Sequence, residues 1–538
     1  MFFSALVIYL AAGWNLAVRH HAVVGDAMAR VANGYYVGFS RDPHLGAVGF
    51  VWNPLPSLTT LPLLSLHRWF PVLRTQAFAG NIVSAGFMAA AVAIVWIQLD
   101  ELHVRRPLAI VLTLVFSLHP LVYQYGANGD SEAALLCFLA LACLGVTRYL
   151  ERRDLGSLVL TGTALGLGYL SRQEFLAAGG AVIMTIMIVA YRAEPGTRVR
   201  KRWAALTDGT LAGLPFGFAI VIWAGTALIL VGSATSYLDA NSEQVTAARS
   251  GIADLVGGTG AIDRAGYFAG QLFRMQPGWL LVIGVALVLG WRRRDARFLA
   301  PIVTFGAVLA AQGVLFGAGS TFGWLRFSIT VVPMTVLLIG VTLSPDGRLA
   351  DNRRTPGRVL TTSARVVLVA TCLLAVPVAL GAMVDTHWGR EEAASVHFLP
   401  GYGFAGSGPG AYPARWLDGY DPVVQWFRAP ARRHALVLTD AQYTFPLVLK
   451  TDDPHQLVIP SDRDYERSVA DPATYHVAYL VVSDGAADTI AASYPELRTA
   501  DHNSIARLVH TFRAGPNRLR IFRVTRSITG ARAGTARG

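Results

Sequence analysis

The chain has 538 residues, of which 53% are hydrophobic and only 15% are charged. A soluble domain carries roughly 25% charged residues, so this composition excludes a large soluble enzyme and indicates a membrane protein with many spans. The net charge of +12 does not indicate nucleic-acid binding. The arginines cluster in short loops between apolar segments, where the positive-inside rule places them.

A membrane-spanning helix needs about 20 apolar residues. Segments of this kind predict a mostly α-helical, polytopic protein of about 11 transmembrane helices, at residues 2–18, 75–98, 107–123, 132–149, 156–170, 175–191, 208–232, 277–291, 298–316, 325–343 and 364–384. The first segment lacks a basic leader and a cleavage site, so we interpret it as a retained span. Residues 53–70 are apolar but interrupted by Pro and His, which favours an interfacial or re-entrant element.

Basic residues mark one side of the membrane. Arginines gather in alternate loops, at 103–106, 148–154, 191–203, 291–297 and 346–358. The positive-inside rule then places the N-terminus in the cytoplasm and the C-terminus outside the plasma membrane. Lys occurs only at Lys201 and Lys450, and this preference for Arg is typical of GC-rich genomes such as those of actinobacteria.

The composition changes after the last span. We expect a transmembrane domain at 1–384, a linker at 385–410, an extracytoplasmic α/β domain at 411–526 and a disordered tail at 527–538. Buried strands are predicted at 435–440, 455–460, 477–484 and 518–524. Segments 485–495 and 503–512 are compatible with helices. Cys137, Cys143 and Cys372 lie in apolar runs, which indicates neither a disulfide framework nor a zinc site.

The outer loops hold the candidate site residues. The first extracytoplasmic loop, 19–53, carries Asp26 just beyond the first span, and its many aromatic residues favour a packed loop. The alternative to a functional role is a structural one: Asp26 would be a charged residue at a helix N-terminus, or would pair with Arg30, one turn later. A long loop at 233–276 has the length of a mobile lid.

Two further outer loops carry acidic residues. Asn128, Asp130 and Glu132 lie between the third and fourth spans, where the alternative is a simple Asn-Gly turn that caps the next helix. Arg172 and Glu174 lie between two short spans, where the alternative is an interfacial ion pair. An arginine on the outer face runs against the positive-inside trend and therefore suggests contact with an anionic lipid phosphate.

The last cluster begins a late span. Arg326 is followed by Phe327 and, about two turns later, by Pro333. A planar guanidinium suits a phosphodiester through paired hydrogen bonds. The alternative is snorkelling of the arginine to lipid headgroups.

These patterns resemble the GT-C superfamily of integral-membrane glycosyltransferases, of the protein-mannosyltransferase, aminoarabinose-transferase and bacterial arabinosyltransferase type. The pattern Asp-Ala-x-x-Arg-x-Ala-x-Gly from Asp26, followed by Trp-Asn-Pro at Asn53, resembles their first extracytoplasmic loop, and the Arg326 segment resembles their late-span motif. Gly25 precedes Asp26 where many relatives have two consecutive acids, which leaves one candidate base and weakens the case for a metal there.

The resemblance implies an inverting transfer of a sugar from a polyprenyl-phosphate donor to a glycan, lipid or protein acceptor at the outer face of the bilayer. Asp26 would be the catalytic base, and Arg326 and Arg172 would bind the donor phosphate. Substrate or a divalent cation would engage a second group of residues: Asp130, Glu132, Arg30, Asn53, Asn128 and Glu174. No cofactor is certain. The alternative function is a non-catalytic scaffold, or a lipid-handling or transport protein of the cell envelope.

Overall fold

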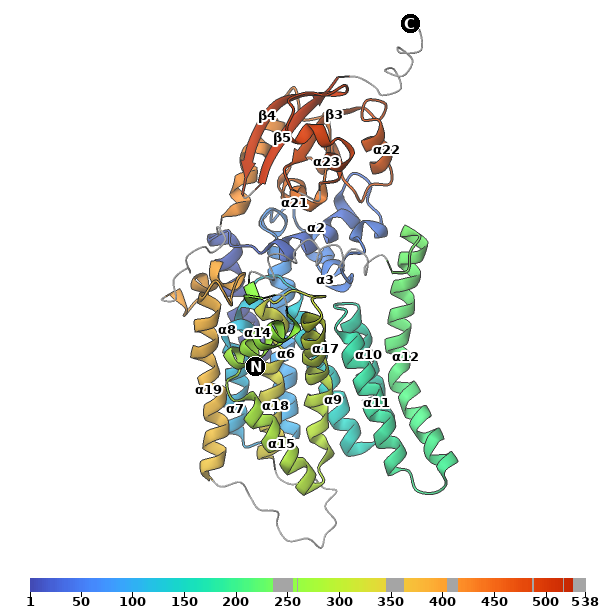
Figure 1. Ribbon diagram of the computed structural model, residues 1–538, viewed down its shortest axis with the longest axis vertical. Helices are drawn as coiled ribbons and strands as arrows, with labels where there is room; N and C mark the ends of the chain where they lie inside the picture. Colours follow the sequence, from blue (N-terminus) through green and yellow to red (C-terminus); the bar gives the residue numbers. More distant parts are fainter. Residues whose placement is uncertain are drawn as a thin grey trace. The chain divides into compact units, whose positions relative to one another are not determined.

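The computed structural model describes residues 1–235, 255–258, 260–344, 362–403, 415–485, 488–515 and 517–525. These residues form two compact units (Figure 1). Unit 1 contains residues 1–12, 50–55 and the described part of 84–412. Unit 2 contains residues 13–49, 56–83 and the described part of 413–538. The domain boundaries expected from the sequence stay a prediction.

Unit 1 is a helical bundle. Its helices are α1 (Phe2–Gly13), α7 (Arg106–Leu118), α8 (Pro120–Ala127), α9 (Glu132–Arg152), α10 (Leu155–Tyr169), α11 (Phe175–Ala193), α12 (Arg198–Val231), α14 (Ala261–Met275), α15 (Trp279–Arg293), α16 (Leu299–Pro301), α17 (Ala307–Gly317), α18 (Val331–Leu343), α19 (Thr362–Val384) and most of α6 (Phe78–Glu101). The mostly helical membrane fold predicted from the sequence is confirmed.

The predicted count of 11 spans is not confirmed. In the described part of the chain, 8 helices are long and apolar enough to cross a membrane, or up to 10 if each of two bent pairs is one span. The predicted span 156–170 corresponds to α10, which has only 15 residues. A helix rises 1.5 Å per residue, so α10 is shorter than a bilayer core of about 30 Å and is not among the eight.

Proline explains the two bent pairs. Helices α7 and α8 meet at 60° before Pro120, and α14 and α15 meet at 82° across the Pro277 segment. Proline lacks a backbone N–H and disfavours the helical conformation of the residue before it. Helix α14 also occupies the second half of segment 233–276, where we expected a loop, because Asp263 Oδ2 accepts a hydrogen bond from the Gly260 N–H at 3.2 Å and fixes the helix start. Residues 236–254 and 259 lie outside the described part, so the lid stays a prediction.

Small residues set the packing of α10 against α12, which lie side by side in Figure 1. A Cβ on Gly162 would lie 2.3 Å from the Ala212 carbonyl oxygen, and one on Gly166 would lie 2.8 Å from the Pro215 carbonyl oxygen. Close backbone approach at small residues is the usual way in which membrane helices associate. The position of the loop after α10, which carries Arg172, therefore depends on these glycines.

Unit 2 is an α/β unit with one five-stranded sheet of order β2-β1-β3-β5-β4. The strands are β1 (Leu436–Thr439), β2 (Leu457–Val458), β3 (Val477–Ser483), β4 (Ala506–Ala514) and β5 (Asn517–Val524); the helices are α2 (Gly25–Phe39), α3 (Leu55–Leu58), α4 (Leu61–Leu64), α5 (Val72–Thr75), α20 (Asp421–Arg428), α21 (Ala441–Lys450), α22 (Tyr465–Ala470) and α23 (Thr489–Ser493). Strands β1, β2 and β3 are parallel, and β5 is antiparallel to β3 and β4. The predicted α/β character is confirmed.

One element of unit 2 was wrongly predicted. Segment 503–512, expected to be helix-compatible, contributes most of strand β4. A turn at Gly515, which has a positive φ of 60°, closes a hairpin with β5, and the long ladder between the two strands outweighs the local preference. Segment 485–495 contains the expected helix, α23. The tail 527–538 lies outside the described residues.

Most of the predicted loop 19–53 folds into unit 2, which contains its residues 19–49, whereas residues 50–53 belong to unit 1. Helix α2 is amphipathic and buries Met28, Val31 and Tyr35 in one hydrophobic core with Leu447 and Val448 of α21. The expected packing of the aromatic loop residues thus has a physical cause. The interrupted apolar segment 53–70 contains the short helices α3 and α4, as its prolines predict.

Candidate functional site

Arg172 sits in the short connection between α10 and α11 in unit 1. The preceding residues are held by the first loop: Asn53 donates a short side-chain hydrogen bond to the Tyr169 carbonyl oxygen, and the Leu55 N–H donates to the Leu170 carbonyl oxygen at 2.9 Å. Asn53 is buried. The Trp-Asn-Pro segment therefore fixes the backbone next to Arg172, which gives Asn53 a positioning role in the structure.

The Arg172 guanidinium is almost completely engaged. Its Nη1 donates to Ser131 Oγ at 3.0 Å and forms a short ion pair with Glu132, while its Nε and Nη2 lie 3.0 and 2.6 Å from Glu174 Oε1. Burial lowers the pKa of Arg172, but the adjacent Glu132 and Glu174 carboxylates more than offset this and raise it. The arginine thus stays charged, and the predicted Arg172–Glu174 pair is part of a larger network.

Arg326 is the second guanidinium group of this region, and it is buried. It lies in the turn before α18, with its Nε 3.3 Å from Glu391 Oε2 and 3.8 Å from Glu132 Oε1 and its Nη1 3.7 Å from Asp130 Oδ2. Only 5% of its side chain is exposed, so this arginine does not snorkel to a surface. Its Cζ also lies 4.4 Å from the ring centroid of Trp324, close enough for a cation–π interaction.

A tight turn presents Asp130. Asn128 and Asp130 form a mutual pair of hydrogen bonds, at 3.0 Å from Asn128 Nδ2 to Asp130 Oδ2 and 3.1 Å from the Asp130 N–H to Asn128 Oδ1. Gly129 between them has a φ of 91°, which a glycine adopts at little cost. The Gly129 N–H donates to Ser84 Oγ at 3.1 Å. The expected turn is real, and it directs a buried carboxylate towards Arg326.

Together these residues form one site, which we call the Arg172–Arg326 cluster. Its members are the two arginines and the carboxylates of Asp130, Glu132, Glu174 and Glu391. Glu132 Oε1 links the two halves because both guanidinium groups approach it. Its other oxygen, Oε2, is buried and has no hydrogen-bond partner in the part of the chain that the structure describes. A buried acceptor of this kind is costly unless a ligand or water donates to it.

Glu391 and Glu392 were missed by the reading of the sequence. Both follow α19 in the segment expected to be a linker, and Tyr125 donates to Glu392 Oε1 at 2.8 Å. Burial raises the pKa of Glu392, and the hydrogen bond from Tyr125 only partly opposes this shift. Two adjacent acids soon after the last span were the available signal, but nothing local connects them to Arg326.

The number of carboxylates in the Arg172–Arg326 cluster raises the question of whether it binds a metal ion. The cluster has four carboxylates against two arginines, and Glu392 lies close by. Among the described residues, no group of three or more His, Cys, Asp or Glu side chains could hold a metal ion. In the structure these acids are paired with the two guanidinium groups. The residues therefore do not form a metal site by themselves.

Asp26 and Arg30 belong to unit 2. Asp26 lies in the first turn of α2, where a carboxylate interacts favourably with the helix dipole, and it is partly exposed. Arg30 lies on the same helix and is buried. This position at the start of α2 agrees with the structural role considered for Asp26, a charge at a helix N-terminus, and it does not conflict with a role in catalysis. The approach of Asp26 to the Arg172–Arg326 cluster stays a prediction.

Comparison with known proteins adds family evidence. A family model described as dolichyl-phosphate-mannose-protein mannosyltransferase matches residues 68–231. The crystal structure of ArnT from Cupriavidus metallidurans bound to undecaprenyl phosphate is 13% identical and matches with a TM-score of 0.51, over 97% of each chain. The apo state of the same protein gives 12% identity and the same TM-score and coverage.

A weaker match is the oligosaccharyltransferase AglB from Archaeoglobus fulgidus in complex with an inhibitory peptide and a dolichol-phosphate. It is 12% identical, with a TM-score of 0.44 over 90% of this chain and 69% of AglB. A search of curated protein sequences finds no match. These findings support the predicted GT-C resemblance: residues 68–231 are similar to the protein-mannosyltransferase family, and the chain is a multi-pass membrane protein with an ArnT-like fold.

Proposed function

We propose that this chain is an inverting glycosyltransferase that moves a sugar from a polyprenyl-phosphate donor to an extracytoplasmic glycan, lipid or protein. The observation that carries the proposal is the Arg172–Arg326 cluster, in which a partly buried and a buried guanidinium group share Glu132, whose Oε2 has no hydrogen-bond partner among the described residues. ArnT, which has the same fold, was crystallised with undecaprenyl phosphate, and this supports a lipid-phosphate donor.

The reaction assigns one role to each group. The acceptor hydroxyl gives its proton to the Asp26 carboxylate as its oxygen forms a bond to the anomeric carbon, and the bond from that carbon to the phosphate oxygen breaks. The donor leaves as a polyprenyl monophosphate with an additional negative charge. Arg326 and Arg172 stabilise that charge, since guanidinium groups bind phosphate oxygens through paired hydrogen bonds. Attack opposite to the leaving group inverts the anomeric centre.

The arginines must change partners when the donor binds. In the structure both are held by carboxylates, so a phosphate has to displace Glu174 or Glu391, the two more exposed acids of the cluster. Asp130 and Glu132 are buried and remain in place. Asn128 fixes the turn that carries Asp130, and Asn53 fixes the backbone next to Arg172. A divalent cation brought by the donor would offset the excess of acid, and no step above depends on it.

Orientation follows from the basic loops. We place the N-terminus in the cytoplasm, and unit 2 and the Arg172–Arg326 cluster on the outer face of the plasma membrane, because the arginine-rich loops alternate in phase along the chain. The short apolar helices and exposed apolar side chains suit a site at the membrane surface, where a polyprenyl tail stays in the bilayer.

Reconstitution tests the proposal. The purified protein in vesicles is supplied with polyprenyl-phosphate mannose or arabinose and a cell-envelope extract as acceptor, and release of polyprenyl phosphate is measured. We expect release that depends on both donor and acceptor. A protein that leaves every donor intact, or that moves the intact donor across the bilayer, would instead support the scaffold or transport function.

A further inference from the structure

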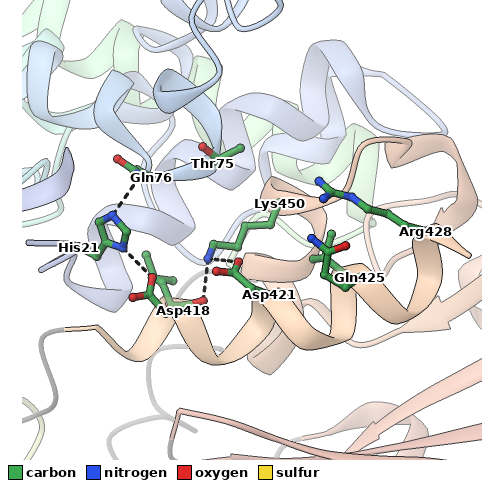
Figure 2. Close-up of a pocket in the computed structure, with 10 residues that line it drawn as sticks. His21, Thr75, Gln76, Asp418, Asp421, Gln425, Arg428 and Lys450 are labelled. Atoms are coloured by element: carbon green, nitrogen blue, oxygen red, sulfur yellow. Dashed lines mark hydrogen bonds and ion pairs between the residues drawn. The ribbon is translucent and has the colours of Figure 1, made fainter. Parts of the chain in front are cut away.

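Unit 2 contains a cavity of about 270 Å³ that is separate from the residues discussed so far (Figure 2). Its walls come from two parts of the sequence: His21 and Gln76 from the N-terminal segments, and Asp418, Asp421 and Lys450 from the C-terminal segments. Pockets for drug-sized ligands have roughly 300–1,000 Å³, so this cavity suits a ligand of about one sugar ring, with a second ring in the opening.

His21 is held in an unusual conformation at one wall. Its φ is 53°, in the left-handed region that few non-glycine residues occupy, and its Nδ1 lies 2.6 Å from Asp418 Oδ1. Non-glycine residues in this region cost energy and gather at binding sites and active sites. Arg415 Nε lies 3.0 Å from Asp418 Oδ2, so Asp418 is fixed from both sides. The wall is therefore organised before any ligand arrives.

Gln76 holds the imidazole ring of His21 from its other side. Its Nε2 lies 3.3 Å from His21 Nε2, and with the His21 Nδ1 proton directed at Asp418 the Gln76 amide group donates this bond. The carbonyl oxygen of Gln76 is buried and has no hydrogen-bond partner within the described residues.

The rest of the lining presents both a donor and acceptors. Lys450 Nζ donates to Leu417 O at 2.8 Å and to Asp421 Oδ1 at 2.5 Å, and Figure 2 shows Gln425 further along α20. More than half of the Asp421 side chain is exposed, and Gln425 is exposed. Both side chains can therefore bond to a ligand without leaving their positions.

The charges of the lining residues cancel. Lys450 and Arg428 are balanced by Asp418 and Asp421, and Arg428 is also paired with Asp452 outside the cavity. An anionic ligand such as phosphate requires excess positive charge, which this lining does not have. Vicinal hydroxyl groups, each both donor and acceptor, match a lining of carboxylate, amide and ammonium groups. The chemistry thus points to a neutral, polyhydroxylated ligand.

We propose that this cavity is a binding subsite for a neutral saccharide, namely the non-reacting part of the acceptor. This inference rests on the proposed function. His21 and Asp26 are five residues apart in one chain, so their Cα atoms are at most about 18 Å apart. A glycan of a few sugar rings can bridge that distance, which would let an acceptor anchored in the cavity present its hydroxyl group to Asp26.

Direct binding tests the subsite. The full-length protein in nanodiscs is titrated with neutral disaccharides of mannose, glucose, galactose or arabinose, and with inorganic phosphate, with saturation-transfer NMR as the readout. We expect at least one disaccharide to bind, unaffected by phosphate. Asp421→Asn and Gln425→Ala should each weaken binding by about tenfold, as expected for the loss of a hydrogen bond. Gln442→Ala, an exposed glutamine on α21 outside the cavity, should bind as the unmodified protein does.

Three results would overturn the subsite: no disaccharide binds, phosphate displaces the disaccharide, or both cavity variants bind normally. Asp26→Asn separates this inference from the proposed function, because that variant should keep full disaccharide binding while losing transfer. Binding without any transferase activity in the unmodified protein would refute the proposed function alone. Transfer activity with no saccharide in the cavity would refute the subsite alone.

Discussion

Glu391 Oε2 lies 3.3 Å from Arg326 Nε, which joins the segment after the last span to the turn that begins α18. Arg326 is buried and Glu391 is partly exposed, so this is the side of the Arg172–Arg326 cluster that can open to a ligand. A phosphate that takes the place of Glu391 would keep the arginine paired throughout. The Arg326 charge therefore keeps a partner during the exchange, and a buried arginine without one would be very costly.

Asp26→Asn should abolish sugar transfer while leaving the fold intact. The amide group keeps the shape of the carboxylate but cannot accept the proton from the acceptor hydroxyl group. General base catalysis typically contributes about 10²–10⁴-fold, and we expect a loss of this size in kcat. Asp100→Asn, which changes an exposed carboxylate at the end of α6, is the matched control. A variant at Asp26 with unchanged kcat would exclude this residue as the base.

Arg326→Lys should fold but bind the donor poorly. The lysine keeps the positive charge among Asp130, Glu132 and Glu391 but loses the planar group that bonds to a phosphate through two N–H donors. One lost hydrogen bond to a charged group is worth about 1.5–3 kcal/mol, so kcat/KM for the donor should fall roughly 10- to 100-fold. Kinetics at varied donor concentration measure this. The control is Arg105→Lys at an exposed position, and an equal fall in both variants would contradict the role of Arg326.

Glu392→Gln should change how stability depends on pH. Burial raises the pKa of Glu392 above its ordinary value of 4.5, so the folded state holds this proton more tightly than the unfolded state. The side chain therefore contributes to stability below pH 4.5, and this contribution is lost as the pH rises through the raised pKa. The glutamine side chain is neutral and does not titrate, so the variant does not lose stability in this way. The melting temperature of the variant, relative to that of the unmodified protein, should therefore be higher at pH 8 than at pH 5. A difference in melting temperature that is the same at both pH values would contradict the burial effect.

Gly162→Ala should destabilise the bundle. The new Cβ would lie 2.3 Å from the Ala212 carbonyl oxygen, so α10 and α12 must separate. Overpacking of this kind costs about 1–3 kcal/mol, and thermal unfolding in nanodiscs should show a lower melting temperature. On α12, Gly225→Ala meets nothing within 4 Å, and alanine is the better helix former. That control should be neutral or stabilising, and equal losses in both variants would show that packing at Gly162 is not the cause.

Much of the membrane fold could be predicted because its causes are local. Each predicted span corresponds to a helix or a bent pair, since about 20 apolar residues in a row satisfy their backbone groups only as a helix. The count of 11 spans was not confirmed, because two pairs of helices are bent at prolines and α10 is short. Strands β1, β2, β3 and β5 were visible as apolar runs. Strand β4 was not, because the hairpin with β5 determines its conformation.

By itself, the sequence determined which charged residues were unusual: Asp130, Glu132, Arg172 and Arg326 stand out because charges at the ends of apolar helices are expensive and need a reason. Only the tertiary structure decided which of them share a site. Ion pairs act over a few ångströms in space, whatever the separation along the chain. Pattern and hydropathy therefore could not show that Glu391 completes the Arg172–Arg326 cluster, or that His21 pairs with Asp418 in the wall of a polar cavity.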